Sequence, residues 1–376
     1  LEQTLARGLR RAVEIVMPGE TFRTSYAEER EVDNGKLTWV DGQRVVVLHG
    51  DAGQIGRAHG ELIGFEVNVC IDSILHTHGL MHAMTTGKWY RKELFEAATQ
   101  LRPFIPQDHL DENRALAEAV GQPPEVIDAL NVFPELFRCS GFAASNSATG
   151  HGQTFLGRVL DRTAPIGLHD CATVFVMAPK GKTPFVHVSY AGFTGCVTGM
   201  NQSQVAVSQA GFDGRTTGQG VPATAMVRMA LEQCSSIADI TELWRPYQRN
   251  GAYDFTIAEG KTGLTLAVST TSDGFELIRP GGDHVKFGAG IPDAVVVSHG
   301  DRLAQLRQRI LEAHGQLTSE SALELMASPV STGITLSSVL LEPAEGTLRV
   351  SNAGHQSAAP ERGYVKLDFQ ALLPQP

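Results

Sequence analysis

The sequence has little positive charge and no long apolar run, and each absence excludes a class of function. Its 31 lysines and arginines stand against 41 aspartates and glutamates, which gives a formal net charge of −10. No run of basic residues interrupts this excess, so the chain repels the phosphates of a nucleic acid and we expect no nucleic-acid partner. No apolar stretch reaches the roughly 18 residues that suggest a membrane-spanning helix, and we expect no membrane crossing.

Cysteines are few, odd in number and widely spaced. The sequence holds no C-x-x-C pair, so it predicts neither a zinc site nor a redox centre. At least one thiol must remain unpaired in a monomer. Free cysteine usually behaves as a small buried apolar residue, and this is our interpretation of Cys70, Cys171, Cys196 and Cys234. The residues that follow Cys139 set it apart from the other four.

Internal repeats and low-complexity linkers are absent as well. A chain of 376 residues with 42% hydrophobic and 19% charged residues is typical of a globular protein with a sizeable core. The first residues do not form a signal peptide, and we expect a cytoplasmic protein. Because the chain begins at Leu1 rather than Met, an exported protein whose signal has been removed stays the alternative.

The pattern of apolar residues changes close to Cys139. Before it, helical spacing predicts helices over 55–80, 94–101, 110–120 and 126–136, after a short strand at 44–49. After it, short runs of β-forming residues predict strands, with helices in blocks between them. The predicted strands are 154–160, 173–177, 185–190, 205–208, 254–258, 264–268, 275–278, 294–298, 337–341 and 347–350, and the helices are 223–233, 237–244, 302–313 and 319–326. Blocks of this kind argue against regular βαβ alternation, and we expect an α+β fold, one compact αββα unit with two stacked antiparallel sheets.

Cys139 is a candidate nucleophile, because Gly157-Arg158-Val159-Leu160-Asp161 follows its thiol at short range. Cysteine attacks as the thiolate, and a nearby guanidinium favours that charged form. If Cys139 begins one strand and the next strand pairs with it, Arg158 returns towards the start of the first strand. Asp161 then lies where it can accept hydrogen bonds from a free α-amine.

A nucleophile in the middle of a chain gains a base when the chain is cut before it. An α-amine titrates near pH ~7.7–8.0, so a residue that carries both thiol and amine contains its own general base. The same thiol can make the cut by attacking the Arg138 carbonyl. We therefore predict autocleavage between Arg138 and Cys139, with 1–138 as a mostly helical precursor part and 139–376 as the catalytic chain.

Several motifs of this chain resemble those of the N-terminal-nucleophile (Ntn) hydrolases. The similarity is greatest to the acyl-CoA:6-aminopenicillanic acid acyltransferase family, also called isopenicillin N acyltransferases, and choloylglycine hydrolases and penicillin V acylases are more distant. The motifs are Gly56-Arg57-Ala58-His59-Gly60, Asp128-Ala129-Leu130-Asn131, Cys139-Ser140-Gly141-Phe142-Ala143-Ala144, Gly157-Arg158-Val159-Leu160-Asp161 and Gly199-Met200-Asn201-Gln202.

The resemblance implies the four-layer αββα Ntn-hydrolase fold and a role for each residue. Cys139 is the nucleophile and autoprocessing residue, Arg158 stabilises the thiolate or binds substrate, and Asp161 holds the freed amine. Relatives often carry an Asn where this chain has Ser298, so we expect this part of the oxyanion hole to be built differently. An oxyanion-hole N–H is expected from the backbone at Gln209, Ala210, Gly211 and Phe212.

These roles predict an enzyme that attacks a linear amide and forms a thioester acyl-enzyme, whose acyl group passes to water or to an acceptor amine. We expect a small-molecule amide substrate and neither a cofactor nor a metal. Acyl-CoA or an acceptor amine is an alternative second substrate, and a homo-oligomer is left open. The alternatives are a bile-salt or penicillin V type amidase and an uncut, non-catalytic protein of the same fold that binds a ligand.

A metal-dependent hydrolase is the third alternative, because three histidines lie close together in the sequence. His78 and His82 share a face of a helix, whereas His76 does not. Asp72 lies one turn before His76, and no further carboxylate in the right register completes a site. We interpret the three as histidines at a helix end or lining a pocket.

Overall fold

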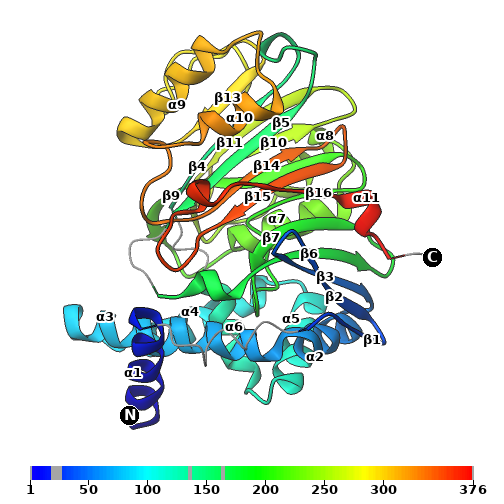
Figure 1. The fold of residues 1–376 in the computed structure, drawn as a ribbon. Helices are drawn as coiled ribbons and strands as arrows, with labels where there is room; N and C mark the ends of the chain where they lie inside the picture. The colour runs from blue at the N-terminus through cyan, green and yellow to red at the C-terminus, as the bar shows by residue number, and fades with distance from the viewer. Residues whose placement is uncertain (1, 18–27, 134–137, 162–165, 375–376) are drawn as a thin grey trace.

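Two β-sheets lie face to face in the computed structural model, which describes residues 2–17, 28–133, 138–161 and 166–374 (Figure 1). Within these residues one sheet has ten strands and the other has six. Helices cover the outer face of each sheet, so the layer order is helix, sheet, sheet, helix. This is the α+β, four-layer αββα arrangement that the resemblance to Ntn hydrolases implies.

The ten-stranded sheet begins with three strands from the N-terminal part of the chain. Its spatial order is β1 (Arg30–Val32), β2 (Gly35–Val40), β3 (Gln43–Gly50), β6 (Ala172–Pro179), β7 (Phe185–Tyr190), β8 (Thr198–Asn201), β9 (Val205–Thr216), β10 (Gly251–Glu259), β11 (Leu264–Thr270) and β12 (Phe275–Ile278). The order in the six-stranded sheet is β13 (Ala294–Val297), β4 (Arg138–Ala144), β5 (Phe155–Asp161), β14 (Thr335–Glu342), β15 (Thr347–Asn352) and β16 (Val365–Asp368).

The prediction of wholly antiparallel sheets is wrong at one pair of strands. β3 and β6 run parallel, with Val45 opposite Val174. A parallel pair needs a long crossover, and here all of 51–171 separates the two strands, so no local pattern announces it. The hairpin of β1 and β2 is also absent from the predicted strands, because its short, partly exposed strands lack a clean apolar alternation.

Helices from two parts of the chain form the outer layers. The layer on the ten-stranded sheet contains α2 (Ala52–Ile71), α4 (Tyr90–Leu101), α5 (Gln107–Ala119), α6 (Pro124–Val132), α7 (Ala223–Gln233) and α8 (Ile237–Trp244). α9 (Gly300–Glu312) and α10 (Ser319–Leu325) cover the six-stranded sheet. The remaining helices are α1 (Glu2–Val16), a π-helix (Asp72–His78), α3 (Gly79–Thr86) and α11 (Phe369–Leu372). In the described residues, none of these helices is both long and apolar enough to cross a membrane.

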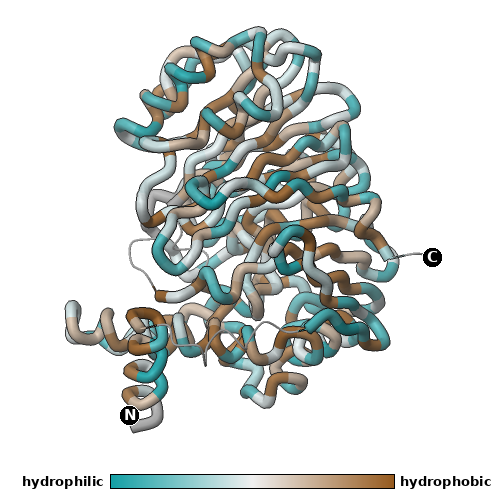
Figure 2. Tube along the Cα trace, in the orientation of Figure 1, coloured by the Kyte–Doolittle hydropathy of each residue, from teal (hydrophilic) through white to brown (hydrophobic). Residues whose placement is uncertain are grey.

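Apolar side chains fill the spaces between the layers. Figure 2 shows apolar segments gathered along the strands, with polar segments towards the outer loops. One cluster of buried residues joins the helices before Cys139 to strands after it, and includes Leu62, Leu130, Phe175 and Phe255. The predicted precursor part and the predicted catalytic part thus share a core.

Glycines let two helices of this layer approach closely. A Cβ on Gly56 would overlap the Glu112 carbonyl oxygen, and one on Gly60 would lie 2.5 Å from the Cβ of Ala119. Both approaches are closer than van der Waals contact, so α2 and α5 can pack in this way only with glycine at these positions. The glycines that flank His59 therefore serve helix packing.

A buried ion cluster fastens α5 to α7. The Arg228 guanidinium donates to both carboxylate oxygens of Glu112, at 3.1 and 2.5 Å, and to Glu232 at 2.8 Å. Burial opposes ionisation of Glu232, but Arg228 and His109 outweigh it and lower the pKa of this carboxyl. An arginine between two carboxylates satisfies charges that would otherwise be costly to bury.

Two histidines are buried next to this cluster. His59 Nε2 accepts a hydrogen bond from the Gly192 backbone N–H at 3.0 Å, and His187 stacks on Phe175 with ring centres 5.1 Å apart. Burial, assisted by the positive charge of Arg228, lowers the pKa of each histidine to about 3. Both are therefore neutral at physiological pH, and His59 holds the backbone after β7.

We predict that the protein loses stability as the pH falls below about 6.5, the ordinary histidine pKa. Between that pH and about 3, His59 and His187 are protonated in the unfolded chain but stay neutral in the folded protein. Each histidine then contributes a slope of about 1.4 kcal/mol per pH unit. In His187→Leu, the free energy of unfolding measured with urea should fall less steeply with decreasing pH, by this amount, between pH 6 and 4.5. The exposed His151→Gln variant should keep the wild-type slope, and an unchanged slope in His187→Leu would refute the assignment.

Candidate active site

Two adjacent strands place Cys139 and Arg158 on the same face of the six-stranded sheet. β4 and β5 pair antiparallel, with Cys139 opposite Leu160 and Gly141 opposite Arg158. Alternate residues of a strand point to opposite faces, so these side chains look towards the ten-stranded sheet. A Cβ on Gly141 would lie 2.9 Å from the Cβ of Ala210 in β9, so glycine is what allows the sheets to approach this closely.

The Arg158 guanidinium contacts the Cys139 thiol directly. Nη2 of Arg158 lies 3.3 Å from Sγ of Cys139, and the two residues are 1% and 4% exposed. Nε and Nη1 of Arg158 have no hydrogen-bond partner in the described part of the chain. A guanidinium stays charged in a protein, so a buried one favours an anion beside it. The Cys139 sulfur is the side-chain atom that the structure places against this guanidinium.

Tyr190 approaches the same place from the ten-stranded sheet. It ends β7 and is 3% exposed, and it lies close to Ser337 of β14. Burial raises the pKa of Tyr190 above its usual value, although Arg158 and Ser337 act in the opposite direction. The phenol therefore stays neutral and lies between the two sheets near Arg158.

Asp161 lies at the same strand end but on the other face. It pairs in register with Arg138, the residue before Cys139, and alternation directs its side chain towards the α9 layer. Its carboxylate accepts a hydrogen bond from Thr335 and forms an ion pair with Arg302 of α9. Burial raises the pKa of Asp161, while Arg302 and Thr335 oppose that rise. The carboxylate is thus one residue from the Cys139 nitrogen in the register, and its role towards a freed amine stays a prediction.

Ser298 also reaches the strand that carries the nucleophile. It follows β13, which pairs with β4, and its hydroxyl lies 2.6 Å from the hydroxyl of Ser140. Both serines are 1% exposed. Position 298 is therefore next to the strand that carries Cys139, and its hydroxyl is engaged by the neighbour of Cys139; its role at the oxyanion stays a prediction.

A β-bulge distinguishes the predicted oxyanion-hole residues from one another. Gln209 pairs with Phe255 and Gly211 pairs with Asp254, so Ala210 is the extra residue. The Gln209 N–H already donates to the Val197 carbonyl at 2.9 Å. Ala210 faces Gly141 of β4, and the extra residue of a bulge is usually left out of the ladder. Of the four, the Ala210 N–H is our preferred oxyanion donor.

Two predicted residues are described only in part. The backbone of Arg138 belongs to β4, and the backbone of Phe212 pairs with Tyr253 of β10. The side chains of Arg138 and Phe212 lie outside the described residues.

Sequence reasoning missed the partners that surround these residues. Arg302 and Thr335 bind Asp161, and Tyr190 and Ser337 lie near Arg158. They come from a helix and from strands far from Cys139 in the chain, and no short motif marks any of them. Only the pairing of β14 with β5 and the packing of α9 bring them in.

Other polar candidates have structural partners. Asn201 donates to the Leu231 and Cys234 carbonyls at 3.0 and 2.8 Å and so holds the end of α7, which is a structural role. The three histidines of the possible metal set are not gathered around one point. His76 lies 3.8 Å from Asp72, His82 lies 3.1 Å from Glu93, and the His78 ring packs on Tyr90 at 4.5 Å.

A different acidic cluster has the spacing of metal ligands. Ligand atoms of Asp108, His109 and Glu232 lie within 4.8 Å of one another. The Lys182 ammonium contacts the carboxylates of both Asp108 and Glu232. A cation of this chain therefore already occupies the position between the carboxylates.

Comparison with known proteins supports the resemblance stated above. The sequence pattern of the family "Acyl-coenzyme A:6-aminopenicillanic acid acyl-transferase" matches residues 148–284. The predicted resemblance to this acyltransferase family is confirmed over that segment. The segment contains Arg158, Asp161 and the predicted oxyanion residues of β9, whereas Cys139 and Ser298 lie outside it.

Three other proteins match at identities of 27% or less. Protein dcd1B of Dictyostelium discoideum is 27% identical over 194 residues, which is 45% of this chain and 39% of that protein's length. An N-acylethanolamine-hydrolyzing acid amidase ortholog of Caenorhabditis elegans is 17% identical, over 55% of this chain and 93% of its own, with a TM-score of 0.44. A mutant of the conjugated bile acid hydrolase of Clostridium perfringens is 11% identical, over 62% and 93%, with a TM-score of 0.43.

We predict that replacing Arg158 with Met slows alkylation of Cys139 by iodoacetamide about tenfold at pH 7.5. The loss of roughly 1.4 kcal/mol of thiolate stabilisation corresponds to this factor. Peptide mass spectrometry of timed samples measures the rate at each cysteine. Cys234 is an internal control, because burial raises its pKa to about 12 and Arg158 does not contribute to that shift. Equal Cys139 rates in the wild type and the variant would show that the Arg158 contact does not activate the thiol.

Proposed function

We propose that this chain is a cysteine amidohydrolase or acyltransferase of the Ntn type, activated by cleavage between Arg138 and Cys139. The observation that carries the proposal is the 3.3 Å contact between Arg158 Nη2 and Cys139 Sγ at the start of β4. The family match over residues 148–284, which includes Arg158 and Asp161, supports it.

Autocleavage uses the thiol that later performs catalysis. The Cys139 sulfur attacks the Arg138 carbonyl carbon, the carbon–nitrogen bond breaks, and the Cys139 nitrogen takes a proton and becomes an amine. Arg138 is then joined to sulfur as a thioester. Water adds to the thioester carbonyl, which releases the Arg138 carboxylate and returns the proton to the Cys139 thiol. The freed amine lies at the end of β4, one residue from Asp161 in the register.

Catalysis repeats the same chemistry on a substrate amide. The neutral α-amine accepts the thiol proton while the sulfur attacks the amide carbonyl, and Arg158 stabilises the negative charge on sulfur before bond formation. The oxyanion accepts hydrogen bonds from backbone N–H groups, for which Ala210 is the candidate. The carbon–nitrogen bond then breaks, and the leaving amine takes the proton from the α-ammonium.

The acyl group leaves the thioester in a second step. Water, or an acceptor amine, attacks the thioester carbonyl while the α-amine of Cys139 removes its proton, and the sulfur departs as a thiolate beside Arg158. Asp161 accepts a hydrogen bond from the α-amine throughout, and Arg302 and Thr335 hold its carboxylate in place. Hydrolysis and acyl transfer therefore differ only in the molecule that attacks.

The first test of this function is the intact mass of freshly purified protein. The wild type is expected to give two fragments, residues 1–138 and 139–376, because the thiol cleaves its own chain. Cys139→Ala is expected to give one uncut chain. Cys234→Ala removes a buried thiol elsewhere and should be cut like the wild type. A wild-type chain that stays whole would contradict the proposal and favour a ligand-binding protein of the same fold.

The second test traps the acyl group. N-acyl amino acids and penicillins are screened for amine release by the mature protein, and neutral hydroxylamine is added to the active reactions. A thioester intermediate predicts that hydroxylamine captures the acyl group as a hydroxamate, detected by mass spectrometry, in competition with water. Cys139→Ala should form no hydroxamate above the uncatalysed rate. Amine release without hydroxamate at any hydroxylamine concentration would argue against an acyl-enzyme.

A further inference from the structure

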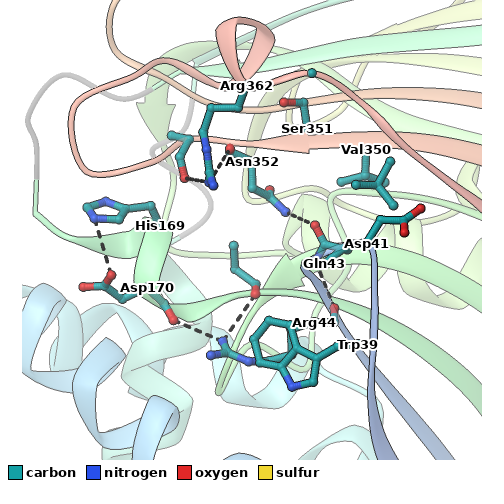
Figure 3. A pocket seen from close by; sticks show the side chains of 15 residues that line it. Trp39, Asp41, Gln43, Arg44, His169, Asp170, Val350, Ser351, Asn352 and Arg362 are labelled. Carbon is teal, nitrogen blue, oxygen red and sulfur yellow. Dashed lines mark hydrogen bonds and ion pairs between the residues drawn. The ribbon is translucent and has the colours of Figure 1, made fainter. Parts of the chain in front are cut away.

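A polar cleft of about 160 Å³ opens between the two sheets at the end where β4 begins. One wall comes from the turn between β2 and β3 and from the 3-10 helix Leu168–Cys171, which leads into β6. The other comes from the end of β15 and the 3-10 helix Ala359–Arg362 (Figure 3). None of the predicted site residues lines this cleft.

The strand register relates the cleft to the nucleophile. Cys139 pairs with Leu160, Leu160 pairs with Ser337, and Ser337 pairs with Asn352, which lines the cleft. Neighbouring strands lie roughly 4.8 Å apart, so these three steps place the cleft about 14 Å from Cys139 along one row of the sheet.

Arg362 is the cation of this cleft that has no carboxylate partner in the described part of the chain. Its Nη1 donates to the Asn352 and Ala353 carbonyls at 3.3 and 3.2 Å, and its side chain enters the cleft in Figure 3. Arg44 already pairs with Glu66 at 3.2 Å. The Nη2 and Nε groups of Arg362 remain as donors in a geometry that fits a carboxylate.

The two acidic residues of the cleft do not neutralise Arg362. Asp170 forms its ion pair with Arg11, 2.6 Å away. Asp41 lies on the far side of Gln43 and Asn352 from Arg362 in Figure 3. Among the described residues, the region around Arg362 therefore keeps a positive charge, although the chain as a whole carries a net charge of −10.

An acceptor lies beside this donor. Nδ2 of Asn352 donates to Oε1 of Gln43 at 2.7 Å, and Nε2 of Gln43 donates to the Arg44 carbonyl at 2.9 Å, so the chain of bonds fixes both amides. Oδ1 of Asn352 is buried and has no partner among the described residues. A buried acceptor without a partner is costly, and a ligand N–H is a group that can satisfy it.

We infer that the cleft binds the carboxylate end of a peptide-like substrate, with the carboxylate on Arg362 and the adjoining amide N–H on Oδ1 of Asn352. Its assignment to the substrate rests on the proposed function. The cleft volume equals about five water molecules at ~30 Å³ each and suits one terminal residue. An extended chain advances ~3.3–3.6 Å per residue, so the scissile amide at Cys139 lies about four residues away. The substrate class is therefore an elongated amide with a free carboxylate.

The smallest probe with both groups is N-acetylglycine, and N-acetylglycinamide is its uncharged match. Ligand-observed NMR titrates each probe against the full chain carrying Cys139→Ala, which keeps the two parts of the protein joined. N-acetylglycine is expected to bind with a millimolar dissociation constant, at least tenfold tighter than N-acetylglycinamide. Equal binding of the two probes, or binding of neither, would overturn the inference.

Variants assign the preference to the cleft. Arg362→Gln should remove the preference for the carboxylate, Arg362→Lys should keep part of it, and Asn352→Leu should weaken both probes. The exposed Arg245, which stacks on Phe275 away from the cleft, is the matched control, and Arg245→Gln should bind as the parent chain does. A preference that survives Arg362→Gln would also overturn the inference. Because binding is measured on a chain that cannot be cut, this outcome is independent of whether the wild type cleaves itself.

Discussion

The site depends on a guanidinium buried between two sheets. Arg158 is 1% exposed; its Nη2 contacts the Cys139 thiol, and its Nε and Nη1 have no hydrogen-bond partner among the described residues. A charge in such surroundings is stable only where the fold supplies an opposite charge or a strong hydrogen bond. The register of β4 and β5 supplies such a hydrogen bond by setting Gly141 opposite Arg158. Because glycine has no side chain, none stands between the guanidinium and the sulfur of Cys139. Under the proposed function, the contact that stabilises Arg158 is also the contact that activates Cys139.

The sheet separates the two halves of the proposed chemistry. Thiol and guanidinium lie on the face towards the ten-stranded sheet, whereas Asp161 and Arg302 lie on the face towards α9. The Cys139 nitrogen is part of the strand itself and sits at the boundary between the two faces. An amine at that position can exchange a proton with the sulfur on one side while it donates to Asp161 on the other. A histidine base would need a place of its own on the crowded inner face, where Gly141 and Ala210 already leave no room for a larger side chain.

Much of the fold and part of the site follow from local patterns. The change from helical to strand periodicity places Cys139 at a strand start, and the spacing of Cys139, Arg158 and Asp161 suffices to predict one pair of strands that carries all three. The parallel pairing of β3 with β6 and the partners Arg302, Thr335 and Tyr190 depend on tertiary contacts between distant segments. Their residue types are ordinary for surface helices and strands, so only packing distinguishes them. The motif assigns Ser298 to the oxyanion region, but no sequence pattern announces its bond to Ser140.

The same register that places Cys139 beside Arg158 also orders the surface around it. Four strands, β4, β5, β14 and β15, each add one residue to the row that begins at Cys139, and the row reaches Asn352 at a cleft whose free cation, among the described residues, is Arg362. The inner part of this row, at Leu160 and Ser337, is buried, at 1% and 2% exposure, whereas the cleft at its outer end is polar and open. Under the proposed function, a substrate that spans the row has its charged end at the polar cleft and its amide beside the buried pair of Cys139 and Arg158. This division suits the chemistry, because a desolvated amide and thiolate react while the charged end keeps its solvation and supplies binding energy from a distance.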